Sequence, residues 1–262
     1  MTVAEAVSLR RVESVMGTTV SVDIRPPFVA VGIVDQVFGQ LADIDARFSP
    51  YRPDSEVSRL VRGELREEDA SLDLRPVLAA CDHLAETTGG AFDARRHRAD
   101  DRLDPSGYVK GWAIEEAAWL IDSAGGRNYW INGGGDVVVR GEAEPGVPWR
   151  VGIRHPDAPD RVAAVLAVSD RAVATSGAYE RGDHIGDPRS GATPAGLRSV
   201  TVVGRGLAFT DAYATAVYVL GLDGLGWLAA QGGDGEYAVL AITDDGRTVW
   251  TDGMERYLVH DA

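Results

Sequence analysis

The chain has 262 residues and a formal net charge of −14, with 26 basic and 40 acidic side chains; 45% of its residues are hydrophobic and 25% are charged. This length is enough for a large hydrophobic core, and the composition excludes an intrinsically disordered chain. The acidic balance argues against binding to nucleic acids or anionic membranes, so a phosphate ligand would need local neutralisation by a metal ion or by backbone dipoles.

The first half of the chain combines one strand pair with several helices. Alternating hydrophobicity over residues 10–25 predicts two strands with an interruption at Met16-Gly17-Thr18. Apolar residues at helical spacing predict helices over residues 29–48 and 73–88, the second ending at Gly89-Gly90. Ser55 is expected to cap a further helix between them. Residues 92–109 are expected to be polar and irregular, followed by a helix over 110–123.

The second half is richer in strands. Strands are predicted at residues 129–131, 136–141, 147–153, 163–168 and 199–203, with a loop-rich segment from 175 to 198. A helix over 210–220 and a closing hairpin of 237–242 with 249–251 follow. Because strands come in neighbouring groups, we expect an α+β fold of largely antiparallel sheets with packed helices. No repeat or linker divides the sequence, which predicts a single domain over residues 1–262.

The cysteine content, the N-terminal segment and the apolar regions bear on where the protein is expected to be located. Cys81 is the one cysteine, which excludes an intrachain disulfide and a multi-cysteine zinc site. Its apolar-periodic surroundings favour a buried small hydrophobe over a catalytic thiol. No basic region followed by an apolar stretch is seen near the N-terminus, and Asp211 and Asp223 interrupt the longest apolar region. We therefore expect a soluble, cytoplasmic protein without a membrane span.

Four segments could carry chemistry, each with a structural alternative. In T-D-A-Y-A-T-A, Asp211 and Thr215 would share one helix face and could present oxygen to Mg²⁺, although by spacing alone capping of the helix by Thr210 or Asp211 is favoured. The segment from Leu103 to Trp112 could offer backbone N–H groups and a lysine to a phosphate, or be an ordinary helix entry. N-G-G-G-D at 132–136 is typical of a tight turn and differs from a dinucleotide fingerprint. The loop from 174 to 191 holds His184 in a polar setting, and the absence of G-x-S-x-G argues against a serine hydrolase.

Taken in order, these segments resemble the ApbE family, the FAD:protein FMN transferases. The resemblance is collinear over essentially the whole chain, and its blocks are V-M-G-T-T at Val15, F-S-P-Y-R-P-D-S-E-V-S-R-L at Phe48, T-G-G-A-F-D at Thr88, L-D-P-S-G-Y-V-K-G-W-A at Leu103, I-N-G-G-G-D at Ile131, A-T-S-G-A-Y at Ala174, H-I-G-D-P-R-S-G at His184 and F-T-D-A-Y-A-T-A-V-Y-V-L-G at Phe209.

The resemblance implies a Mg²⁺-dependent transfer of FMN from FAD onto a Thr or Ser hydroxyl of a target protein, with release of AMP. It implies that the metal is bound by Gly107, through its carbonyl, and by Asp211 and Thr215. It assigns catalysis to His184, as the base, and to Asp211. It implies contacts to the flavin nucleotide at Met16, Tyr51, Ala91, Phe92, Asp93, Asp104, Lys110 and Ile185. The expected partners are FAD and a target protein with an acceptor motif close to D-x-x-[ST]-G-A-[ST].

The sequence also departs from the family pattern. Nine residues separate Asp93 from Leu103, where many members carry a longer insert, and Pro105-Ser106 stands where Leu-Gly is common. The lipoprotein signal of exported members is missing, which favours an intracellular target. Two other functions remain open: an FAD pyrophosphatase that uses water as acceptor, and a non-catalytic FAD-binding protein.

Residues 187–193 resemble the acceptor motif itself, although chance is the favoured explanation. The corresponding hypothesis is that Thr193 is flavinylated by the chain's own activity. An intact mass that shows no FMN addition after incubation with FAD and Mg²⁺ would contradict it.

Overall fold

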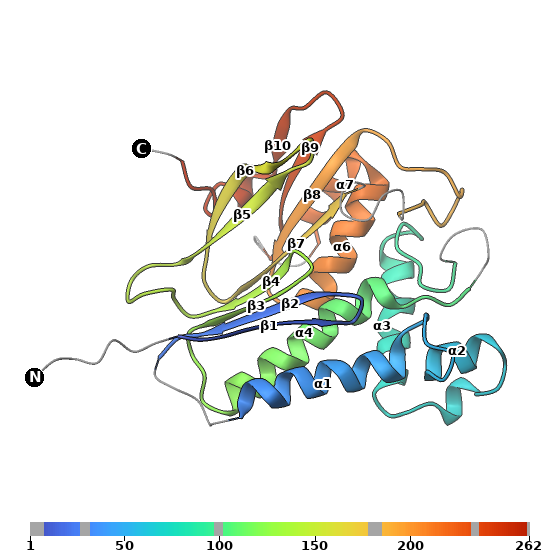
Figure 1. Cartoon of the computed structure of the whole chain (residues 1–262). Helices are drawn as coiled ribbons and strands as arrows, with labels where there is room; N and C mark the ends of the chain where they lie inside the picture. The colour runs from blue at the N-terminus through green and yellow to red at the C-terminus, as the bar shows by residue number, and fades with distance from the viewer. Residues whose placement is uncertain (1–7, 27–31, 97–101, 178–184, 232–235, 261–262) are drawn as a thin grey trace, which may run out of the picture.

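The computed structural model describes residues 8–26, 32–96, 102–177, 185–231 and 236–260. An antiparallel sheet of eight strands runs through it in the order β1-β2-β3-β4-β7-β8-β9-β10 (Figure 1). Its strands are β1 (Leu9–Val15), β2 (Thr18–Ile24), β3 (Tyr129–Gly133), β4 (Asp136–Arg140), β7 (Arg171–Gly177), β8 (Leu197–Gly204), β9 (Ala238–Thr243) and β10 (Thr248–Trp250). A separate hairpin pairs β5 (Trp149–His155) with β6 (Ala158–Val168). The expected α+β fold with antiparallel sheets is confirmed.

The longer helices lie against one face of this sheet (Figure 1). They are α1 (Ile33–Phe48), α2 (Glu56–Val61), α3 (Leu74–Thr87), α4 (Ser106–Ser123), α6 (Leu207–Leu220) and α7 (Leu222–Ala229), with short 3₁₀ turns η1 (Glu67–Asp69) and η2 (Asp252–Met254). Helix α6 packs directly on β7 and β8, and α4 packs between α6 and α1. Among the described residues, every helix is too short or too polar to cross a membrane.

Alternation along the central strands creates a core on each side of the sheet. In β4, Val138 packs into the large core beneath the helices, whereas Val137 and Val139 point to a second core. This second core is completed by Trp149 and Leu166 of the β5–β6 hairpin, which therefore covers the face opposite the helices. Full burial of one such side chain contributes about 1.5–3 kcal/mol to stability, so the packing on both faces stabilises the sheet.

Three elements differ from the sequence-based expectation. Strand β7 was expected to be loop from residue 175, yet six of its seven residues are buried, so packing on both faces overrides the loop character of its Thr, Ser and Gly. Helix α4 begins at Ser106, earlier than expected, where the Asp104 carboxylate accepts the Ser106 N–H at 3.0 Å. Helix α7 was not predicted; it follows α6 after Gly221, whose φ of +68° breaks one apolar stretch into two helices.

Candidate functional site

A lysine between two buried carboxylates forms the centre of the candidate site. Lys110 on α4 makes an ion pair with Asp136 Oδ2 at the start of β4, and its Nζ lies 3.3 Å from Asp211 Oδ2 on α6. Asp136 and Asp211 are 1% and 4% exposed, and Lys110 keeps 20% of its side chain accessible. Carboxylates buried this deeply require a paired charge, and the lysine supplies it while it still reaches solvent.

Close packing of α4 on α6 brings these residues together. A Cβ atom on Gly111, next to Lys110, would lie 2.7 Å from the Leu207 carbonyl oxygen, so the two helices cross at nearly backbone contact. One turn further along α4, Glu115 Oε2 accepts the Ala208 N–H at 3.1 Å and so satisfies a donor at the start of α6. Burial raises the pKa of Glu115, and the backbone N–H groups of Leu207 and Ala208 oppose that shift. These contacts fix the register of α6 relative to Lys110.

Asp211 and Thr215 lie one turn apart on α6, as the sequence predicted. The capping alternative was wrong: α6 begins at Leu207 after Gly206, and Thr210 donates its hydroxyl hydrogen back to the Gly206 carbonyl at 2.5 Å. The Thr215 hydroxyl lies 3.1 Å from the Ser176 hydroxyl of β7. A carboxylate and hydroxyl groups therefore occur on facing elements, which is an oxygen-rich donor set of the kind that Mg²⁺ prefers.

Asp136 is fixed by the sheet as well as by the lysine. Its Oδ1 accepts the backbone N–H of Thr175 on β7 at 3.0 Å. The Thr175 hydroxyl in turn lies 2.9 Å from the Thr201 hydroxyl on β8. Hence each oxygen of the Asp136 carboxylate has a distinct partner, one in the sheet and one in α4.

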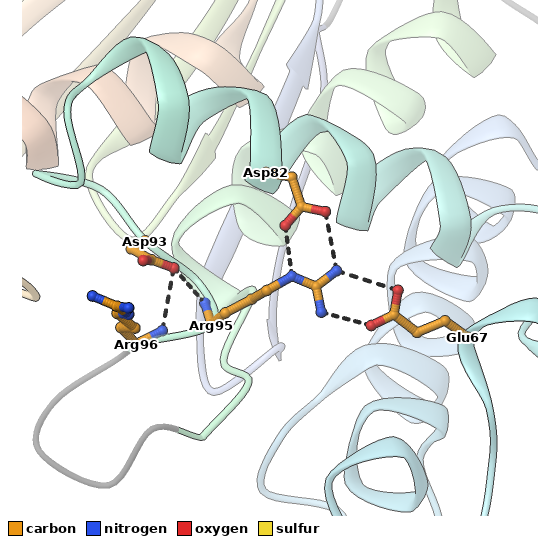
Figure 2. Close-up of polar contacts among 5 residues, drawn as sticks. All are labelled: Glu67, Asp82, Asp93, Arg95 and Arg96. Atoms are coloured by element: carbon orange, nitrogen blue, oxygen red, sulfur yellow. Dashed lines mark hydrogen bonds and ion pairs between the residues drawn. The ribbon is translucent and has the colours of Figure 1, made fainter.

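The predicted flavin-contacting segment lies beside the first turn of α4. Ala91 and Phe92 are 1% and 5% exposed, and a Cβ atom on Gly107 would lie 3.1 Å from the Phe92 ring. The segments around residues 92 and 107, distant in sequence, are therefore in contact. Asp93 Oδ1 accepts the backbone N–H groups of Arg95 and Arg96 at 2.8 and 3.2 Å, so it shapes the turn that follows (Figure 2).

Arg95 ties this turn to two other elements. Its guanidinium donates to both carboxylate oxygens of Asp82 on α3, at 2.6 and 3.0 Å, and to both of Glu67 on η1, at 2.6 and 3.2 Å (Figure 2). Hydrogen bonds to Asp82 and Glu67 raise the pKa of Arg95, so its charge is permanent. The sequence does not reveal this role of Arg95, because no local pattern links residues 67, 82 and 95.

The loop after residue 184 approaches the same segment. A Cβ atom on Gly90 would lie 3.2 Å from Cγ of Arg189, so the stem of Arg189 packs over the glycine turn before Ala91. Asp187 accepts two hydrogen bonds from the Arg189 guanidinium, which lowers the pKa of Asp187. Ile185 is partly buried on the main core, and Thr193 is exposed. His184, the predicted base, lies outside the described residues.

The remaining predicted residues are more dispersed. Met16 forms the β1–β2 turn with a φ of +56° and packs partly on the main core. Asp104 lies at the entry to α4, where it accepts the Ser106 N–H. Tyr51 is 83% exposed, in the loop between α1 and α2. No described contact joins Tyr51 to the Lys110 cluster.

The N-G-G-G-D segment was predicted as a tight turn, and Asp136 at its end was not predicted as a site residue. The signal was the acidic residue itself, because an aspartate at the start of a strand buried on both faces needs a cationic partner. Ser176 was missed in the same way, inside a segment assigned to loop. Within the described ranges, no three Asp, Glu, His or Cys side chains are grouped as metal ligands, and the metal assignment to Gly107, Asp211 and Thr215 stays a prediction.

Comparison with known families shows to which family a chain with this site belongs. The sequence model of the ApbE family matches residues 16–97 and 94–239. The chain belongs to the ApbE family. Its Lys110, Asp136 and Asp211 cluster lies wholly within the matched residues.

Individual ApbE relatives and solved ApbE structures agree with this assignment. An FAD:protein FMN transferase of Rhodobacter capsulatus is 36% identical over 190 residues, which cover 70% of this chain and 36% of that protein. The Vibrio cholerae enzyme of the same name is 29% identical over 240 residues, covering 87% of this chain and 67% of the relative. The matched region thus spans about a third of the Rhodobacter relative and two thirds of the Vibrio one.

Solved structures match over nearly the whole chain. The flavin transferase ApbE from Vibrio cholerae superposes with a TM-score of 0.85 and 25% identity, covering 97% of this chain and all of the other. The apo form of the Pseudomonas stutzeri flavinyl transferase ApbE gives a TM-score of 0.84 at 22% identity, with both chains fully covered, and supports the fold.

Proposed function

We propose that this chain is an FAD:protein FMN transferase, which moves FMN from FAD onto a Thr or Ser hydroxyl of a target protein and releases AMP. The observation that carries the proposal is the ion cluster of Lys110 with Asp136 and Asp211, set beside Thr215 and Ser176 in a chain of the ApbE family. A phosphoryl-transfer site uses fixed charges of this kind, because its substrate carries a negatively charged diphosphate.

The proposed reaction is a displacement at phosphorus. The hydroxyl oxygen of the target forms a bond to the phosphorus of the FMN half, and the bond from that phosphorus to the bridging oxygen breaks. AMP leaves with the bridging oxygen, and the hydroxyl proton passes to a base. We assign the base to His184, since histidine changes protonation near neutral pH.

Lys110 is a cation that the described residues contribute to the site. Its ammonium is held by two carboxylates from different elements and is partly accessible, so it is positioned before any substrate binds. We propose that it neutralises charge on the nucleotide phosphates. Its distance from Asp211 puts this charge next to the proposed metal ligand.

The residues present fit a magnesium ion. The buried Asp211 carboxylate and the Thr215 hydroxyl, one turn apart, are hard oxygen donors, and the Gly107 carbonyl is the third proposed ligand. When bound, Mg²⁺ would neutralise the diphosphate and act as a Lewis acid toward its oxygens. Asp211 and Thr215 would orient the ion from a rigid helix.

The flavin nucleotide is proposed to contact the segments that meet around Phe92 and Gly107. Buried Ala91 and Phe92 anchor this segment to the main core, and Asp93 shapes the adjoining turn, so the segment is held in a fixed position for the nucleotide. Contacts from Met16, Tyr51, Asp104 and Ile185 complete the proposal, as the family resemblance implies. The acceptor is a protein segment close to D-x-x-[ST]-G-A-[ST].

The deciding experiment supplies the protein with FAD, Mg²⁺ and a peptide that bears the acceptor motif. We expect a covalent flavin–peptide adduct by mass spectrometry and AMP in equal amount by chromatography. A peptide with valine in place of the acceptor threonine is the matched control and should stay unmodified. Free FMN and AMP with unmodified peptide would instead indicate an FAD pyrophosphatase, and bound, unreacted FAD would indicate a binding protein.

Asp211→Asn tests whether the reaction uses the proposed site. It keeps the size of the side chain and removes the charge of the proposed metal ligand, so both transfer and hydrolysis should be lost. Full activity in this variant would contradict the assignment of Asp211.

A further inference from the structure

Asp136 is a buried carboxylate at the site to which the family resemblance gives no role. It is 1% exposed, and its two oxygens serve different elements: Oδ1 accepts the Thr175 N–H at 3.0 Å, and Oδ2 contacts the Lys110 ammonium. A carboxylate this deeply buried is costly unless each oxygen is satisfied. Both of its partners are supplied by the fold itself.

Lys110 is therefore shared between two carboxylates that lie in different surroundings. Asp136 is anchored to the backbone of β7, whereas Asp211 lies on α6 beside the Thr215 hydroxyl. The ion pair of Lys110 with Asp136 Oδ2 is the closer one, and Asp211 Oδ2 is 3.3 Å from the same nitrogen. If one of these carboxylates lost its charge, the attraction of the lysine to the other would become stronger.

We propose that Asp136 is a positioning residue, which holds the Lys110 ammonium and thereby weakens its pairing with Asp211, the carboxylate that binds a divalent cation. This inference rests on the proposed function, because it takes Asp211 as the metal ligand. Without the charge of Asp136, the ion pair of the lysine with Asp211 becomes stronger, and an incoming cation must compete with it at a desolvated site. Asp136 thus acts on the metal through Lys110 and touches neither metal nor substrate.

Asp136→Asn is the informative substitution. Asparagine has nearly the same volume and keeps a carbonyl oxygen for the Thr175 N–H, but it removes the charge that faces Lys110. Asp136→Ala would leave the Thr175 N–H without its acceptor and risks a general loss of stability.

The second variant combines Asp136→Asn with Lys110→Met. Methionine replaces the lysine stem with a flexible apolar chain and removes the ammonium that would otherwise capture Asp211. If Asp136 acts through Lys110, Lys110→Met raises metal affinity by a larger factor in the Asp136→Asn background than in the wild type. An equal factor in both backgrounds means that the two residues act independently and contradicts the proposal.

The matched control is Asp23→Asn on β2. Asp23 is 0% exposed, like Asp136, and is paired with two cations, Arg10 and Arg25. Its substitution removes a buried, ion-paired carboxylate from the same sheet without touching Lys110 or Asp211. It should lower stability and leave metal affinity unchanged.

The readout is binding of Mn²⁺, followed by the electron paramagnetic resonance signal of the free ion, to the folded chain without FAD. We expect the Kd for Mn²⁺ to rise about tenfold in Asp136→Asn, the size typical of disturbing a residue behind a metal ligand, and to fall by a larger factor on Lys110→Met in that variant than in the wild type. An unchanged Kd in Asp136→Asn, or an equal effect of Lys110→Met in both backgrounds, overturns the proposal.

Failure of the proposed function gives a different pattern. A wild-type chain that binds Mn²⁺, shows the expected pattern in the variants and yet transfers no FMN overturns the transferase proposal alone. A wild-type chain that binds no Mn²⁺ overturns the role of Asp136 together with that of Asp211, even where FMN transfer is seen.

Discussion

Gly111 lies against Leu207 so closely that a Cβ atom on Gly111 would fall 2.7 Å from the Leu207 carbonyl oxygen and 2.9 Å from Cα of Ala208. Both neighbours are backbone atoms, which cannot rotate away as a side chain could. Lys110 precedes this glycine on α4, and Asp211 follows Leu207 by one turn on α6. The crossing of the two helices therefore sets the separation of the charged groups at the site.

Gly111→Ala is expected to force α4 and α6 apart. Inserting a methyl group into a packed interface typically costs about 1–3 kcal/mol of stability, and here the shift also lengthens the Lys110–Asp211 contact. We expect a lower urea midpoint and, under conditions where the variant is fully folded, a lower kcat for FMN transfer.

Gly39→Ala on α1 is the matched control for this substitution. A Cβ atom there meets nothing within 4 Å, and Gly39 is exposed inside a helix. It should gain about 0.5–1 kcal/mol in stability with unchanged activity. If Gly111→Ala behaves like Gly39→Ala in both assays, the tight crossing has no functional consequence.

Thr215→Val tests the hydroxyl beside Asp211. Valine keeps the shape of threonine, so the change removes a proposed metal ligand and the contact with the Ser176 hydroxyl with little change in packing. We expect the Kd for Mn²⁺ to rise at least about tenfold, whereas Thr215→Ser, which keeps the hydroxyl, should bind Mn²⁺ nearly as the wild type does.

Ser176→Ala separates the two effects of that change. It removes the hydrogen-bond partner of Thr215 and leaves the threonine hydroxyl in place. A small effect in Ser176→Ala with a large one in Thr215→Val supports direct metal binding by Thr215. Equal effects in the two variants would assign Thr215 to the hydrogen bond instead.

Much of the fold follows from local pattern in the sequence. The helices α1, α3 and α6 carry apolar residues at helical spacing, and Ser55 caps α2 by accepting the Ser58 N–H at 3.0 Å, as expected. Strand β7 escaped prediction because its stability comes from cores on both sides. Val173 packs into one core while Ala172 and Ala174 pack into the other, a fact of tertiary structure that no short window records.

The site was predictable only where its residues are close in sequence. Asp211 and Thr215 were paired from their spacing on one helix. Asp136 and Lys110 come from a strand and a helix that the fold alone brings together, so their ion pair left no local signature. The family resemblance supplied expected roles for most of the other residues, and those roles stay predictions until tested.

Arg95→Ala is expected to weaken FAD binding with little effect on the chemical step. The guanidinium connects Asp82 and Glu67 to the turn after Asp93, so its loss loosens the segment that carries Ala91 and Phe92. Because these ion pairs are partly exposed, the loss of stability should stay below about 1 kcal/mol. We expect a several-fold rise in KM for FAD and a kcat close to that of the wild type.

Arg62→Ala provides the comparison for Arg95. Arg62 also donates two hydrogen bonds to one carboxylate, at 2.7 Å each, but its partner Glu64 is a near neighbour in the chain. The Arg62→Ala substitution should leave the KM for FAD unchanged. An Arg95→Ala variant with wild-type KM, or one that loses kcat alone, would show that the turn does not depend on this arginine.

Cys81 is expected to be an inert thiol whose contribution to stability disappears at high pH. It is 2% exposed on α3, and burial raises its pKa to about 12. An unfolded thiol has a pKa of about 8.5, so the folded state binds the proton more tightly. The stabilisation is complete below pH 8 and is lost as pH rises from about 8.5 toward 12.

Comparison of the wild type with Cys81→Ala isolates this effect from the tyrosines, which titrate in both proteins. The difference in unfolding free energy between the two, measured in urea, should shrink between pH 7.5 and pH 10. Iodoacetamide should label Cys81 rapidly in the unfolded wild type at pH 8 and hardly at all in the folded one, because the thiolate is the reactive form. Rapid labelling of the folded protein, or a stability difference that does not change with pH, would restore the alternative of a reactive cysteine.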